Sequence, residues 1–192
     1  YNDDELDDNI IAVPSSVTKI GSNAFEFCSS IIEVKIPSSV INIESYAFRG
    51  CSSMINLNLP SSLSYIGDNA FFECNSLISM KIPLKIIDIK TFTFRDCSSL
   101  VNIFIPASVN SIGYCAFYGC SALVAVSIPF SVNEIGYCAF CGCSSLKKLT
   151  FDEPSSLTSI GGSAFEGCSS LVSVSLPMSV ITVGGNIFKD CT

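Results

Sequence analysis

The sequence is a chain of 192 residues with a formal net charge of −7, and five of its 17 acidic residues lie together in residues 3–8. The rest of the chain holds 12 acids against 10 bases and has no basic stripe, so we expect no nucleic-acid partner. Hydrophobic residues make up 48% of the chain. No apolar run approaches the roughly 18 residues that a membrane-spanning helix needs, so no membrane insertion is expected.

Residues 1–13 are predicted to form an acidic lead-in followed by the last strand of an incomplete repeat. The lead-in is the run YNDDELDD, and the strand is predicted from Ile10, Ile11 and Val13 before Pro14. A solvated acidic segment is one interpretation of the run, and a charged docking tail is the other. The run lacks the basic start and the apolar segment of a secretory signal.

From Pro14 onward the sequence repeats with a period of 23 residues. Proline, phenylalanine and cysteine recur at this spacing, which is shifted once by a two-residue insertion before Pro154. A fixed period in this range is typical of a solenoid, in which each unit contacts only its neighbours. We therefore expect one array of seven whole units and a truncated eighth, with the boundaries 14–36, 37–59, 60–82, 83–105, 106–128, 129–153, 154–176 and 177–192.

Both ends of the chain fall inside a repeat. We therefore expect the array to be a piece of a longer one, and its open ends are candidates for end-to-end self-association.

Each unit is predicted to contain two strands and two changes of direction. In the first unit, Val34 and Ile36 alternate with polar residues, which is typical of a half-buried strand. The Ala-Phe-x-x-Cys stretch has the spacing of one short helical turn. The short strand before it is followed in six units by a glycine, for which we expect a turn with positive φ. These glycines are Gly21, Gly67, Gly113, Gly136, Gly161 and Gly184, and Glu44 and Lys90 replace glycine in the other two units.

Eight of the 11 cysteines occupy one position of the repeat: Cys28, Cys51, Cys74, Cys97, Cys120, Cys143, Cys168 and Cys191. A ladder of equivalent sulfurs has no rule for pairing, so we interpret these residues as small buried hydrophobes. Cys115 and Cys138 share a second position, and they are the pair to test if any disulfide exists. Cys138 and Cys141 form a C-x-x-C spacing, but a metal or redox role is not expected, because the repeat itself produces this spacing.

The composition also argues against an enzyme. The chain has no histidine to activate a serine or cysteine nucleophile, and neither a P-loop nor a dinucleotide-binding fingerprint is present. We expect no catalytic residue, no cofactor and no metal site.

Three motifs together resemble the BspA-like class of leucine-rich repeat. They are Leu-x-x-Ile-x-Ile-Pro, Ser-Val-x-x-Ile-Gly and Ala-Phe-x-x-Cys. They stand at Leu123 to Pro129 and at Val132 to Cys143, and the resemblance extends over residues 10–192, with departures at Thr93 and Ile187. It implies a β-rich, right-handed leucine-rich-repeat solenoid with minor α or 3-10 structure and with parallel strands on the concave face. It also implies a protein-binding role, commonly adhesion by cell-surface proteins.

Candidate partner-binding residues are those that depart from the small polar pattern of the outward strand positions. An exposed aromatic among polar residues is typical of an interface anchor, although isolated exposed apolar residues are also common on surfaces that bind nothing. The insertion Asp152–Glu153 is expected to form a bulge at the end of a strand. The candidates are Lys81, Phe104, Phe130, Lys148, Asp152 and Glu153.

A secondary candidate patch consists of Tyr114, Tyr118 and Tyr137. If this part of the repeat is helical, the three rings are expected to meet. Packing between coils explains the same residues equally well.

Three functions fit the sequence. The first is a non-enzymatic, adhesion-type binding module at a cell surface or in a secreted protein, with a protein or other macromolecular ligand. The second is a cytoplasmic scaffold or regulatory subunit that docks a signalling enzyme, which the thiol-rich interior and the absence of an N-x-Ser/Thr acceptor favour. The third is a spacer whose length alone matters.

Overall fold

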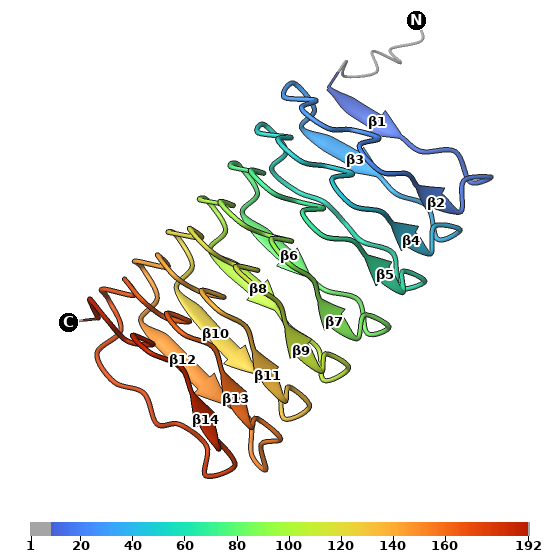
Figure 1. Cartoon of the computed structure of the whole chain (residues 1–192). Helices are drawn as coiled ribbons and strands as arrows, with labels where there is room; N and C mark the ends of the chain where they lie inside the picture. Colours follow the sequence, from blue (N-terminus) through green and yellow to red (C-terminus); the bar gives the residue numbers. More distant parts are fainter. Residues whose placement is uncertain (1–8, 192) are drawn as a thin grey trace, which may run out of the picture.

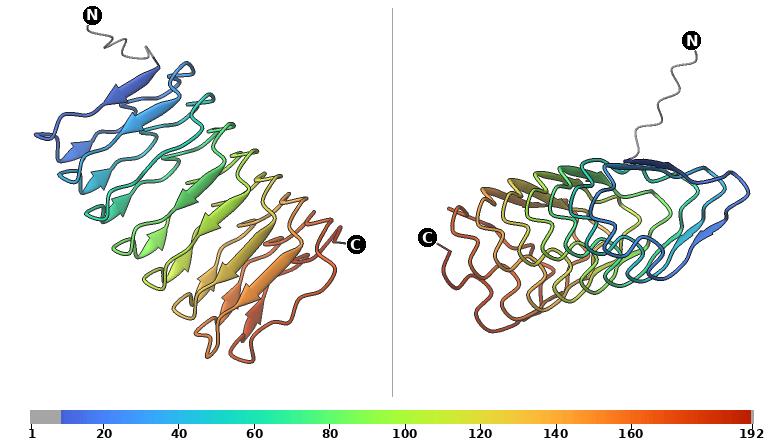
Figure 2. Two further views of the ribbon diagram at one scale, coloured as in Figure 1. Left: turned by 180° about the vertical axis from the view of Figure 1, so that it is seen from behind. Right: turned by 90° about the horizontal axis from the view of Figure 1, so that it is seen from above.

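The structure is a computed structural model that describes residues 9–191. The repeats form successive coils of a parallel β-solenoid, and the first and last coils lie at opposite ends of the stack (Figure 1). The coils lie one behind another along a common axis (Figure 2). This arrangement confirms the predicted class of β-rich repeat solenoid. The predicted lead-in, residues 1–8, lies outside the described residues.

The long strands form one face of the solenoid, which we call the long-strand face. Val34 is buried in the middle of its strand and Lys35 beside it is exposed, as the alternating pattern predicts. The strand predicted before Pro14 is also present, and it pairs in parallel with its successor. The long strands are β1 (Ile10–Ala12), β3 (Glu33–Lys35), β6 (Ser79–Lys81), β8 (Asn102–Phe104), β10 (Ala125–Ile128) and β12 (Lys148–Phe151).

The short strands follow the prolines and form the second set of parallel sheets. They recur one per coil, and each contains two residues. They are β2 (Lys19–Ile20), β4 (Asn42–Ile43), β5 (Tyr65–Ile66), β7 (Asp88–Ile89), β9 (Ser111–Ile112), β11 (Glu134–Ile135), β13 (Ser159–Ile160) and β14 (Thr182–Val183).

The Ala-Phe-x-x-Cys stretch is a run of tight turns, so the prediction of a helical turn there is wrong. Cys115 and Gly119 have φ values of 48° and 71°, and such residues interrupt a right-handed helix. Successive N–H groups of these turns donate alternately to a carbonyl of their own coil and to a carbonyl of the next coil. That of Tyr118 donates to the Cys115 carbonyl three residues earlier, whereas that of Phe117 donates to the Ala139 carbonyl of the next coil. Bonds between coils replace the i−4 bonds of a helix.

The glycines after the short strands do not have positive φ, which contradicts the expected reason for their presence. Five of the six are required because neighbouring backbones approach closely, whereas a Cβ atom added to Gly21 would meet nothing within 4 Å. A Cβ atom added to Gly136 would lie 2.8 Å from the Gly113 carbonyl carbon and the Tyr114 nitrogen of the preceding coil, closer than real Cβ contacts. The residues of the described chain that do adopt positive φ lie two per coil within the following turns.

The core consists of columns of identical residues. Phe25, Phe48, Phe71, Phe94, Phe117, Phe140, Phe165 and Phe188 stack with ring centroids 5.0 to 5.6 Å apart. The cysteine column runs beside this stack, and from Cys51 onward each thiol donates a hydrogen bond to a phenylalanine carbonyl, as that of Cys120 does to Phe94 over 3.1 Å. The same carbonyl also accepts the N–H of Cys97. The cysteine thus fills a small apolar position and supplies a donor.

The insertion before Pro154 does not produce a bulge in the strand, contrary to expectation. The pairing of β10 with β12 continues in register from Ala125 with Lys148 to Ile128 with Phe151. Asp152 and Glu153 follow in the connection after the strand, where an extra pair of residues does not disturb the ladder.

Candidate functional site

Both families of strands are interrupted at the same junction between coils. Within residues 9–191, the stretch 57–59 belongs to no strand ladder, and a single bridge from Glu33 to Asn56 links it to β3. The short strands β5 and β7 also do not pair, although every other pair of successive short strands does. We call the space between residues 56–66 and residues 79–90 the open seam.

Backbone hydrogen bonds that join other coils are missing along the open seam. Elsewhere, Asn110 donates its N–H to Ile87 over 2.7 Å, and Gly113 donates to Ile89 over 2.8 Å. The equivalent N–H groups one coil earlier, those of Ile87 and Lys90, have no backbone acceptor in the described chain. The seam therefore presents unpaired backbone groups in a region where the fold normally satisfies them.

The open seam is closed at both ends. At one end, the Ile78 N–H donates to the Ile55 carbonyl over 3.2 Å. At the other end, the Asn69 N–H donates to the Thr91 carbonyl over 3.0 Å, and the phenylalanine stack continues from Phe71 to Phe94 without a break. The seam is thus an opening in the two strand faces only, and the core behind it is intact.

The fourth unit departs from the repeat at two positions that face the preceding coil. In the neighbouring coils a serine hydroxyl bonds back to the previous coil, as Ser62 does to Val40 over 2.8 Å and Ser108 to Ile86 over 2.7 Å. Lys85 takes this serine position in the fourth unit and cannot make the same short bond. Lys90 takes the glycine position, but Glu44 takes it in the second unit and still donates its N–H to Ile20 over 2.9 Å, so loss of this glycine alone does not open a junction.

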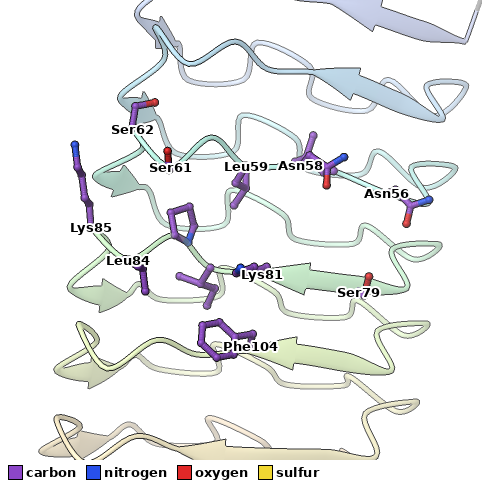
Figure 3. Close-up of a pocket in the computed structure, with 13 residues that line it drawn as sticks. Asn56, Asn58, Leu59, Ser61, Ser62, Ser79, Lys81, Leu84, Lys85 and Phe104 are labelled. Carbon is purple, nitrogen blue, oxygen red and sulfur yellow. The ribbon is translucent and has the colours of Figure 1, made fainter.

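A groove lies over the first part of the open seam, and we call it the seam groove (Figure 3). Its volume is about 840 Å³, which is in the range of ligand sites. Asn56 and Asn58 line one side, and Lys85 extends from the other side toward the coil of Ser61 and Ser62 (Figure 3). The remaining lining residues are Leu57, Leu59, Ser79, Lys81, Ile82, Pro83, Leu84 and Phe104.

The seam groove combines exposed apolar side chains with positive charge. Leu84 and Phe104 are 71% and 51% exposed. The Lys81 ammonium lies 5.9 Å from the centroid of the Phe104 ring, a cation–π contact between neighbouring strands. The lining contains no carboxylate, and neither Lys81 nor Lys85 has an ion-pair partner among residues 9–191. An acidic protein thus carries an uncompensated cationic groove.

The structure separates the other predicted residues from the seam groove. Lys148 and Glu153 line a second hollow of about 460 Å³ between β12 and residues 173–175. Asp152 accepts a hydrogen bond from the Ser127 hydroxyl over 3.0 Å. Phe130 is exposed but lines neither hollow, and its carbonyl accepts the Ser156 N–H. Of the six primary candidates, Lys81 and Phe104 share the seam groove, and Lys148 and Glu153 share the second hollow.

The three tyrosines do not form one cluster. Tyr114 and Tyr137 stack with centroids 5.6 Å apart and an angle of 10° between the rings. Tyr118 instead lies under the Arg95 guanidinium, at 5.0 Å. No ring contact joins Tyr118 to Tyr114 in the part of the chain that the structure describes, because the turns direct the two side chains differently.

Two arginines form aromatic clusters that the sequence reasoning missed. Arg49 lies 5.0 Å from the Phe27 ring and 5.1 Å from Phe72, and Arg95 lies 5.3 Å from Phe72 on its other side. The signal was present in the sequence, since one repeat column reads Arg49, Phe72, Arg95 and Tyr118 in order. Alternating arginine and aromatic residues stabilise the turn face by cation–π contacts.

The cysteines are free in residues 9–191, and those of the main column are poor nucleophiles. Burial raises the pKa of Cys51 and of Cys168 to about 12. Burial also raises the pKa of Cys115 to about 11, and its thiol hydrogen-bonds with that of Cys138. A protonated thiol is unreactive at neutral pH, so these residues serve packing and not catalysis.

Residues 9–191 lack two further features. No helix there has the length and apolarity needed to cross a bilayer. No group of three or more histidine, cysteine or acidic side chains there has a geometry that could hold a metal ion.

Comparison with known proteins identifies the family. The family model described as BspA type Leucine rich repeat region matches residues 5–123 and 87–192. The chain belongs to the BspA-type leucine-rich repeat family. Leucine-rich repeats are generally non-enzymatic protein-interaction modules, and no catalytic family is indicated.

Three solved bacterial structures are similar to this BspA-type array. A leucine-rich repeat protein of T. pallidum is 33% identical, with a TM-score of 0.79 over 85% of this chain and 78% of that one. A leucine rich cell surface protein of Faecalibacterium prausnitzii is 26% identical, with a TM-score of 0.65 over 95% of this chain and 67% of that one.

The third, a leucine-rich repeat protein of Eubacterium ventriosum, is 20% identical and shows the fold alone. Its TM-score is 0.75, and the match covers 95% of this chain but only 59% of that one. Among curated proteins, none matches this chain.

Proposed function

We propose that this BspA-type array is a protein-binding module of a cell-surface protein and that it binds its partner on the long-strand face at the seam groove. The observation that carries the proposal is the groove of about 840 Å³ with Phe104 and Leu84 exposed on its wall. Exposed aromatic and aliphatic side chains beside charged groups are the usual anchors of protein interfaces. The similarity to the cell surface protein of F. prausnitzii supports the location.

Substitution of Phe104 tests this proposal. Phe104→Ala is expected to weaken binding of a captured partner by about fivefold or more, which corresponds to about 1 kcal/mol, because it removes an anchor from the groove wall. The melting temperature is expected to change little, since half of the side chain is already exposed to water.

The partner is sought by incubating the immobilised array with extracellular matrix proteins and, in parallel, with a cytosolic lysate. Phe130→Ala is the matched control, because Phe130 is an equally exposed phenylalanine that lies outside the groove. Equal loss of folding and binding in Phe104→Ala would assign Phe104 to the core and contradict the proposal.

A second candidate function is an intracellular scaffold, which the 11 free cysteines favour. Free buried thiols are typical of proteins from a reducing compartment. Titration of thiols in the denatured, natively purified protein separates the two: a full set of reactive thiols supports the scaffold, whereas missing thiols support secretion.

A further inference from the structure

We infer that the open seam binds an extended acidic segment of a partner protein, whose backbone supplies the strand that is missing between residues 56–59 and β6. This inference rests on the proposed function and specifies the chemistry of its partner.

The backbone of the open seam has the donors and acceptors that a peptide strand needs. Residues 57–59 pair with no strand of the described chain, and β6 pairs only with β8 on its far side. Exposed edges of this kind bind extended peptides by adding a strand, with main-chain hydrogen bonds providing affinity. The seam differs from an ordinary sheet edge because it offers unpaired groups on two coils that face each other.

The side chains of the seam groove specify an acidic segment. Lys81 and Lys85 both line the groove, and no carboxylate shares the lining with them. Both ammonium groups lack an ion-pair partner in residues 9–191, whereas Lys90, at the far end of the seam, is bonded to Asp88 over 3.2 Å. A partner carboxylate would form charge-assisted hydrogen bonds with the two free lysines.

The apolar residues of the groove indicate which residues alternate with the acidic ones in the bound segment. Successive residues of an extended strand point to opposite faces, so every second side chain of a bound peptide faces the groove wall. Lys81 and Phe104 are register partners and present their side chains on one outer face, whereas the buried side chains of Leu57 and Ile82 line the groove from the core side and favour aliphatic residues there. The preferred segment therefore alternates acidic residues with branched aliphatic ones.

A sulfated polysaccharide would also be attracted by two lysines, but the backbone of the seam favours a peptide. A polysaccharide sulfate accepts hydrogen bonds and cannot match both the donors and the acceptors of an open strand edge. A peptide backbone carries one donor and one acceptor per residue at the required spacing.

The probe is a blocked synthetic peptide of about eight residues in which glutamate and valine alternate, long enough to span the seam in extended form. Binding to the folded array is measured by fluorescence anisotropy at low salt and at about 0.15 M salt. Three comparison ligands are a lysine–valine peptide, the same glutamate–valine peptide with alternate amides N-methylated, and a heparin oligosaccharide.

The variants distinguish the contribution of the lysine charges to peptide binding from that of backbone pairing. Replacement of both groove lysines, Lys81→Gln with Lys85→Gln, is expected to weaken binding of the glutamate–valine peptide by tenfold or more. Lys35→Gln is the matched control, because Lys35 occupies the same strand column in β3 and lies outside the groove, and it is expected to have no effect. Lys90→Gly leaves both groove lysines in place but permits the coils to close, and it is also expected to weaken binding.

The N-methylated peptide is expected to lose most of its affinity. Equal binding of the methylated and unmethylated peptides would overturn the inference that backbone pairing occurs, and so would tight binding of heparin without binding of the peptide. If the peptide does not bind but a captured protein still depends on Phe104, this inference fails and the proposed function stands. If the peptide binds but capture is insensitive to Phe104→Ala, the proposed anchor fails and the acidic-peptide site stands.

Discussion

Two junctions between coils of the same solenoid differ in whether their strands pair, and the spacing of the repeat does not predict this difference. The closed junction joins residues 125–136 to residues 148–161, and there β10 pairs with β12 and β11 with β13. The open seam joins the equivalent positions three coils earlier and has neither pairing. The closed junction contains the two-residue insertion, whereas the open seam has the regular 23-residue spacing.

The comparison teaches that repeat length does not control whether coils close, and the unit that follows the open seam is the one that lacks both the serine and the glycine. The insertion adds residues in a connection, where Asp152 still donates its N–H to Ile128 and Ser156 donates to Phe130. In the open seam, Lys85 and Lys90 replace a serine and a glycine that face the preceding coil. An insertion outside the strands costs little. Glu44 replaces the same glycine and still donates its N–H to Ile20, so the glycine replacement alone does not separate two coils.

The largest effect is expected when the core behind the open seam is weakened. Phe94→Ala and Phe117→Ala each remove a ring that is almost fully buried in the stack, at a cost of about 3–5 kcal/mol in unfolding free energy. At Phe94 the stack and the hydrogen bonds of the turns connect the coils without help from the strands, so this variant is expected to unfold in two steps. Phe117→Ala, between paired coils, is expected to unfold in one.

Chemical denaturation followed by circular dichroism and by tyrosine fluorescence distinguishes the two outcomes. Coincident single transitions for both variants would show that the seam does not divide the array energetically. The difference between the two junctions would then concern only the surface of the array and not its unfolding.

The sequence predicts the fold well because the fold depends on period. Columns of Phe117 and Cys120 follow from the spacing alone, since every coil returns the chain to the same position. The reason for the glycines could not be predicted, because close backbone approach and positive φ both favour glycine. Only the folded structure distinguishes the two explanations. The turns were mistaken for a helix because a spacing of three residues fits both.

The candidate site was predicted only in part. Lys81 and Phe104 depart from their column and are adjacent in the structure, so comparing columns was sufficient to find them. The open seam was not predicted, although Lys90 is one of the two residues that replace the turn glycine. A missing hydrogen bond is a property of two neighbouring coils, and no single column displays it.

An intermediate effect is expected from alkaline pH, and it tests whether water reaches the core through the open seam. Burial raises the pKa of Cys97, whose thiol donates to Phe71 behind the seam, and that of Cys168, whose thiol donates to Phe140 at the closed junction. The unfolded chain loses these protons above about pH 8.5, while the folded chain keeps them. Each buried thiol thus stabilises fully below that pH and costs about 1.4 kcal/mol per pH unit above it.

Cys97→Ala and Cys168→Ala are each expected to reduce the slope of unfolding free energy against pH by the same amount between about pH 9 and 11. Urea denaturation at several pH values measures the slope. A clearly smaller change for Cys97→Ala would mean that its thiol already ionises in the folded state, and that the seam is open down to the core.

The smallest effect is expected from closing the seam. Lys85→Ser together with Lys90→Gly restores the residues that the closed coils carry, so two hydrogen bonds across the seam are expected to form. Each contributes about 0.5–1.5 kcal/mol, and the added glycine offsets part of the gain, so the net stabilisation is about 1 kcal/mol. Amide hydrogen exchange is the sharper measurement, because it reports each N–H separately.

In the unsubstituted chain the amides of Ile87 and Lys90 are expected to exchange much faster than those of Asn110 and Gly113, their equivalents one coil later, which donate to Ile87 and Ile89. In the double variant the amides of residues 87 and 90 are expected to approach the protection of that next coil. Equal protection of Ile87 and Asn110 before any substitution would mean that the coils are already bonded in solution. The difference between the two junctions, and with it the site for an added strand, would then be absent.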